Sequence, residues 1–98
     1  MKYIFKDLGP LEAGKFIEVG LSTSANVRFM DNENFEKFKN KETHDFIGGF
    51  VRFTPYTIKL PVAAHWIVVV DLGGMPGTVN ASVTVHQTEK KLKKTPFT

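Results

Sequence analysis

Any catalysis by this chain would depend on histidine, carboxylate, hydroxyl or lysine side chains, because its 98 residues include no cysteine. Disulfide bridges, thiolate chemistry and cysteine zinc sites are therefore excluded. His65 and His86 could lie near each other on neighbouring strands, but two histidines without a third ligand make a poor metal site. Asp71 would lie roughly 20 Å along the strand from His65, too far to complete it. We expect no metal ion, no cofactor and no catalysis.

A glycine-rich stretch, "VVVDLGGMPGTV" at 68–79, stands where nucleotide-binding proteins often place a phosphate loop. The spacing of Gly73, Gly74 and Gly77 fits neither of the two common phosphate-binding patterns. The segment that follows alternates like a strand, so no helix N-terminus is available to receive an anion. The pattern favours a hairpin turn instead.

The hairpin interpretation also predicts a strand register. Val70 should pair with Val79 and Trp66 with Val83, because a slip of one residue would place valine opposite asparagine. The opposite face of the first strand then holds His65, Ile67, Val69 and Asp71, with His86 diagonal to His65. Ile67 and Val69 are apolar where a solvated strand would be polar, so either the chain's own helix and loops or another molecule should cover them.

The elements that position these residues are mostly strands. Period-two alternation or short β-branched and aromatic runs, separated by turn residues, predict strands within 15–22, 25–31, 46–54, 56–61, 64–72 and 78–86. Six strands with regular turn signals and one short helix predict an all-β fold, a small β-sandwich or partly open barrel.

The expected helix lies within "DNENFEKFKN", residues 31–40. Phe35 and Phe38 are three positions apart, which suits one face of a helix of about two turns. Asp31 or Asn32 can cap its start and Asn40 can end it.

The net charge of +3 is unevenly distributed. Residues 1–88 contain nine basic and nine acidic side chains, so the excess lies in the lysine-rich segment 89–98. We therefore expect one domain over 1–88, a solvated C-terminal tail over 89–98, and no nucleic-acid partner. Because no run of eighteen apolar residues occurs, we expect no membrane partner and a cytoplasmic location.

Polar residues near the strand ends suggest a second kind of site. Asn26, Arg28, Asp31 and Asp71 could recognise a small molecule or saccharide in the adjoining loops. Arg28 and Asp31 lie on opposite faces of one strand, so both can point into one pocket only if a bulge intervenes. A structural ion pair between Arg28 and a carboxylate is an equally good interpretation of the arginine.

The segments "SANVRFMDNENFEKFKN", "GGFV" and "AHWIVVVDLGGMPGTVNASVTV" resemble a bacterial family known as domain of unknown function 1883. The resemblance extends from about Phe5 to Val85 and implies a small β-sandwich with no established activity. Some relatives place the domain beside a TIR signalling domain, which suggests interaction or sensing. We therefore expect a non-catalytic module for protein interaction or self-association, with binding of a small molecule or saccharide as the alternative.

Overall fold

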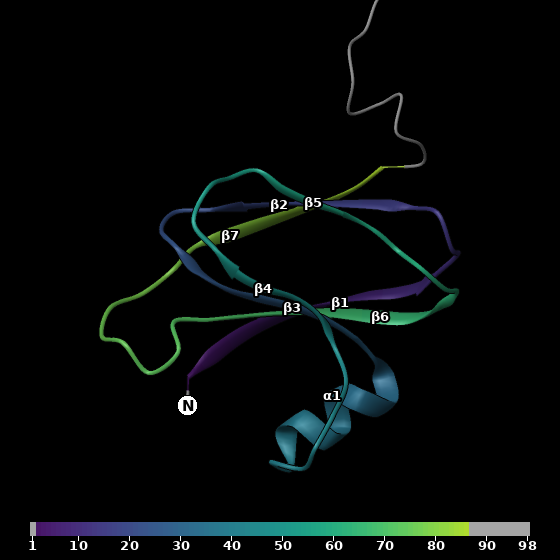
Figure 1. Ribbon diagram of the computed structural model, residues 1–98, viewed down its shortest axis with the longest axis horizontal. Helices are drawn as coiled ribbons and strands as arrows, with labels where there is room; N and C mark the ends of the chain where they lie inside the picture. Colours follow the sequence, from purple (N-terminus) through teal and green to yellow (C-terminus); the bar gives the residue numbers. More distant parts are fainter. Residues whose placement is uncertain (1, 87–98) are drawn as a thin grey trace, which may run out of the picture.

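The structure is a computed structural model that describes residues 2–86, so the predicted tail at 89–98 lies outside the described residues. Two antiparallel sheets form a sandwich, and one helix lies below the larger sheet in Figure 1. The elements are β1 (Tyr3–Leu11), β2 (Phe16–Leu21), β3 (Ala25–Asp31), α1 (Asn32–Lys39), β4 (Ile47–Val51), β5 (Tyr56–Lys59), β6 (Ala64–Asp71) and β7 (Ala81–His86).

The four-stranded sheet has the order β1-β6-β3-β4, and the three-stranded sheet has the order β5-β2-β7. The predicted all-β sandwich with one short helix is therefore confirmed, and neither sheet closes into a barrel. No helix within residues 2–86 has both the length and the apolar character needed to cross a membrane.

The sequence patterns did not predict β1, the N-terminal strand. It forms one edge of the four-stranded sheet and pairs with β6, from Tyr3 opposite Asp71 to Leu11 opposite Ala64. Its alternation is obscured because Lys6 lies on the same side as Ile4 and because the register shifts between Asp7 and Gly9. Such a bulge inserts an extra residue and moves the following side chains out of the period of two.

The predicted hairpin between the two C-terminal strands is wrong. β6 lies between β1 and β3, whereas β7 pairs with β2 in the other sheet, with Val19 opposite Val83. The glycine-rich connection therefore crosses from one sheet to the other. At 72–80 it is longer than the two to five residues typical of hairpin loops, and this extra length allows the crossing.

Two apolar clusters hold the fold together. The larger fills the space between the sheets and includes Ile17, Val27, Phe29, Trp66 and Val68. The smaller lies between the four-stranded sheet and α1, and its buried members are Met30, Phe35, Ile67 and Val69. Because both faces of β6 are covered, six of its eight residues are buried.

The helix begins and ends as predicted. Asp31 is its N-cap and accepts a hydrogen bond from the backbone N–H of Asn34 at 2.8 Å, and Asn40 follows its last turn. Phe35 is buried on the sheet and Phe38 packs beside it. α1 therefore covers the outer face of β6 that the sequence identified as unusually apolar.

Candidate functional site

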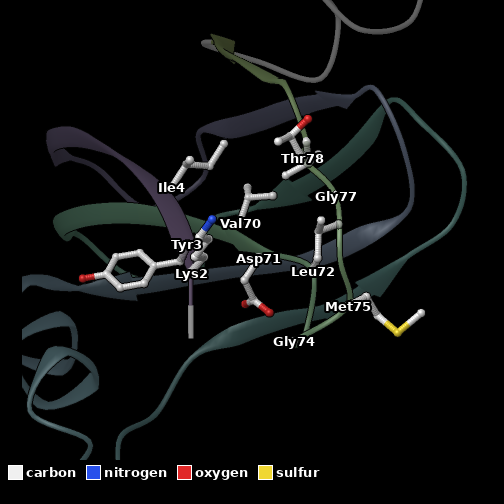
Figure 2. A pocket seen from close by; sticks show the side chains of 11 residues that line it. Lys2, Tyr3, Ile4, Val70, Asp71, Leu72, Gly74, Met75, Gly77 and Thr78 are labelled. Atoms are coloured by element: carbon white, nitrogen blue, oxygen red, sulfur yellow. The ribbon is translucent and has the colours of Figure 1, made fainter.

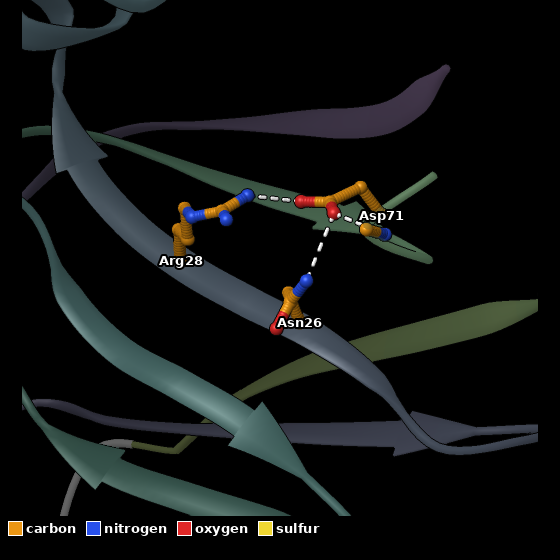
Figure 3. Close-up of polar contacts among 4 residues, drawn as sticks. Asn26, Arg28 and Asp71 are labelled. Carbon is orange, nitrogen blue, oxygen red and sulfur yellow. Dashed lines mark hydrogen bonds and ion pairs between the residues drawn. The ribbon is translucent and has the colours of Figure 1, made fainter. Parts of the chain in front are cut away.

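A partly buried polar cluster lies at the end of β6, on the outer face of the four-stranded sheet (Figure 3). The Asp71 carboxylate forms an ion pair with Arg28 and accepts a hydrogen bond from Asn26 Nδ2 at 3.0 Å. It also accepts one from the backbone N–H of Gly73 at 2.7 Å. Its side chain is 0% exposed. Three donors therefore satisfy a carboxylate that has no contact with solvent.

The sheet register brings these residues together. Asn26 lies directly opposite Asp71, and Arg28 is two positions further along the same face of β3, opposite Val69. Because successive side chains of a strand point to opposite faces, Asn26 and Arg28 must share the face of Asp71. The structural ion pair that the sequence left open is thus present, and it occupies the residues considered for ligand binding.

Two glycines allow the backbone to pass close to this cluster. Gly48 on β4 is paired with Arg28 and has a φ of 118°, and a Cβ there would lie 2.2 Å from the carbonyl oxygen of Val27. Gly73 has a φ of 64°, and its Cβ would lie 3.1 Å from Asn26 Nδ2. Side chains rarely adopt such φ values, so both positions favour glycine.

The two strand histidines lie apart. His65 is on β6 and its Nε2 is 2.6 Å from Asp7 Oδ1, whereas His86 is on β7 in the other sheet and its Nε2 is 2.8 Å from Glu18 Oε1. The expected proximity of the two rings is wrong, because it depended on the hairpin. Residues 2–86 contain no group of three His, Asp or Glu side chains that could hold a metal ion.

The pKa of Asp7 is lowered by its neighbours. The backbone N–H of Gly9 donates a hydrogen bond to its carboxylate at 2.8 Å, and this bond, together with the His65 ring, lowers the pKa of Asp7 below its ordinary value. The hydrogen bond between Gly9 and Asp7 spans the bulge of β1, where the register shifts between these two residues.

The remaining candidate residues have local structural contacts. Asp31 caps α1, and Ile67 and Val69 are buried under that helix. The apolar surface expected at Ile67 and Val69 is therefore covered by the chain itself, which was one of the two alternatives.

The exposed aromatic residues next to β4 were missed as a site. Phe46, Phe50 and Phe53 have relative exposures of 43%, 64% and 83%. We call them the phenylalanine surface. The available signal was Phe50. Its neighbours Gly49 and Val51 pair with core residues of β3, so Phe50 points to the outer face, opposite Asn26.

Over residues 2–86 these features define a seven-stranded β-sandwich with a helix over one sheet and a partly buried Asn-Arg-Asp cluster. The chain belongs to the family described as domain of unknown function (DUF1883), whose model matches residues 1–89. The motifs that suggested this family supply Asn26, Arg28, Gly48, Asp71 and Gly73. These motifs are far apart in the sequence, but their residues lie together in or beside the polar cluster. Searches of the curated proteins and of the solved structures found no match.

Proposed function

We propose that this domain is a non-catalytic protein-interaction module that binds a strand of a second protein chain along β4. The supporting observation is the character of this edge strand. β4 is the terminal strand of its sheet, and its sequence, Ile-Gly-Gly-Phe-Val, contains neither charge nor proline. An edge strand without such protection is a template for pairing with another chain.

The phenylalanine surface adds apolar contact area beside this edge. Phe50 lies on β4 itself, Phe46 immediately precedes the strand, and Phe53 follows it. The Arg28 guanidinium lies 5.4 Å from the centre of the Phe46 ring, so the polar cluster holds a cation against one of the exposed rings. Aromatic and arginine side chains are enriched at protein interfaces, which supports the assignment.

The other edge of the same sheet has several features that oppose pairing. β1 contains a bulge, and Lys6, Asp7 and Pro10 lie along it. Bulges, charges and proline are the devices by which edge strands avoid unwanted partners. This contrast between the two edges supports β4 as the interacting edge.

The alternative, a saccharide or small-molecule site beside Asn26, Arg28, Asp31 and Asp71, has less support. Asp71 binds Asn26 and Arg28, and Asp31 caps α1. A ligand there would have to replace these contacts. Protein interaction requires no such rearrangement.

The test combines light scattering over a range of protein concentrations with capture of partners from a lysate. Phe50→Lys places a charge on the proposed edge, and Val62→Lys is the matched control because Val62 is an exposed apolar residue outside the site. We expect Phe50→Lys to abolish self-association or partner capture and Val62→Lys to preserve it. Equal behaviour of Phe50→Lys and the unmodified protein, or a monomer that captures nothing, would contradict the proposal.

A further inference from the structure

A second surface lies on the opposite side of the sandwich, where β1 and β7 face each other. A cavity of about 700 Å³ lies between the start of β1 and the connection 72–80 (Figure 2), and a smaller one of about 240 Å³ lies between β1 and β7. Both are lined by Ile4 and Val70, so they form one continuous groove, which we call the seam groove.

The seam groove exists because the sandwich is open here. β1 and β7 are edge strands of different sheets, and no ladder joins them. The groove is largely apolar; its apolar lining includes Ile4, Val68, Val70, Leu72, Val79 and Val83. Its combined size is in the range of small-molecule sites in proteins.

The rim of the groove is positively charged. Ile4 and Lys6 alternate along β1 and therefore face the same side. Lys6 lines the smaller cavity, and Lys2, which immediately precedes β1, lines the larger one. Within residues 2–86, neither lysine has an ion-pair or hydrogen-bond partner. The acid that lines the groove, Asp71, is already paired with Arg28.

We infer that the seam groove binds an aliphatic carboxylate, such as a fatty acid. The hydrocarbon chain of this ligand would lie on the apolar floor of the groove, and its carboxylate would pair with Lys2 and Lys6 on the rim. Charge complementarity selects an anion, since two cations without partners flank the groove and the carboxylate of Asp71 is neutralised. The apolar lining selects a hydrocarbon chain over a saccharide, whose hydroxyl groups would lose hydrogen bonds to water without replacement.

The test is calorimetric titration of the full chain with decanoate, at concentrations where the ligand remains monomeric. We expect saturable binding to the unmodified protein and an affinity about fivefold lower for the double variant Lys2→Gln/Lys6→Gln, which removes the cations of the rim. Ile4→Gln should also weaken binding because it places an amide on the floor. Lys2, Ile4 and Lys6 are exposed, and thermal unfolding checks that the variants are folded.

Two controls distinguish binding in the seam groove from non-specific binding of decanoate to the protein surface. Lys37→Gln/Arg52→Gln changes the net charge equally but leaves the groove intact, so its affinity for decanoate should match that of the unmodified protein. Decyltrimethylammonium has a similar chain and the opposite charge, and it should bind much more weakly. The inference is overturned if decanoate does not bind, if Lys2→Gln/Lys6→Gln retains full affinity, or if the cationic analogue binds as tightly. None of these results depends on Phe50 or β4.

Discussion

At Asp71 a fully buried carboxylate is balanced by Arg28, Asn26 and a backbone N–H. Replacing Arg28 by methionine keeps most of the side-chain volume but leaves this negative charge without its cation. Removing one partner of a buried ion pair strongly lowers the free energy of unfolding, and the partial exposure of Arg28 makes this loss smaller. We expect Arg28→Met to lower the free energy of unfolding by about 2–4 kcal/mol in urea denaturation.

The matched comparison for this prediction is the double variant Arg28→Met/Asp71→Leu. It removes the buried charge together with its partner and should recover part of the lost stability. A loss below about 1 kcal/mol for Arg28→Met alone would show that water already compensates the carboxylate.

Asp7 provides a prediction about pH. Its pKa is lowered in the folded protein, first by the hydrogen bond from Gly9 and then by His65, so folding favours its ionised form. The stabilisation is present above the pKa of the unfolded state and is lost as the pH falls through the lower pKa of the folded state. The stability difference between the unmodified protein and Asp7→Asn should therefore shrink as the pH falls from about 5 to below about 4.

Chemical denaturation of both proteins, repeated at intervals of about one pH unit between pH 7 and pH 2.5, measures this stability difference. Carboxyl NMR titration provides an independent check of the direction. A pKa of Asp7 at or above its ordinary value would contradict the argument.

The residue pattern predicted part of the polar cluster. Alternation placed Asn26 and Arg28 on one face of a strand, and the ion pair between Arg28 and a carboxylate was an open interpretation. The identity of the carboxylate could not be predicted, because it depends on β3 lying beside β6 with Asn26 opposite Asp71. That adjacency joins segments about forty-five residues apart, and local patterns contain no information on it.

At the scale of elements, β3 and β4 can approach closely because of Gly48. A methyl group at this position would overlap the carbonyl oxygen of Val27, and its φ of 118° is unfavourable for any side chain. We expect Gly48→Ala to destabilise the protein by more than about 2 kcal/mol, since strain and steric overlap add.

Gly49 is the control for this prediction. It is the next residue on the same strand, yet a Cβ there would meet no atom within 4 Å. Gly49→Ala should change the free energy of unfolding by less than about 1 kcal/mol. Similar losses for the two variants in urea denaturation would contradict the assigned role of Gly48.

The elements themselves could mostly be predicted. Six strands and the capped helix follow from period, turn residues and charge placement, because these signals are local. β1 could not be identified in this way, since a bulge disturbs its alternation and the charged Lys6 lies on the same side as the apolar Ile4. The pairing of β7 was also mistaken, because its alternation fits β2 as well as it fits β6.

At the scale of the whole molecule, the two proposed surfaces lie at opposite edges of the four-stranded sheet. β4 forms one edge and β1 the other, with β6 and β3 between them. We therefore expect Phe50→Lys to leave the affinity for decanoate unchanged, and Lys2→Gln/Lys6→Gln to leave self-association or partner capture unchanged. Calorimetry and light scattering on both variants measure this; a shift of more than about threefold in either cross-comparison would show that the sheet couples the two edges.

The position of β1 also has a consequence for the order in which the chain can fold during synthesis. Tyr3 pairs with Asp71, so β1 leaves the ribosome before β6 and has no partner in its sheet until β6 has been made. Ile4 and Phe5 remain unprotected throughout that interval. Lys6 and Asp7, which follow Phe5 on β1, reduce the risk of aggregation during the time before β6 has been made.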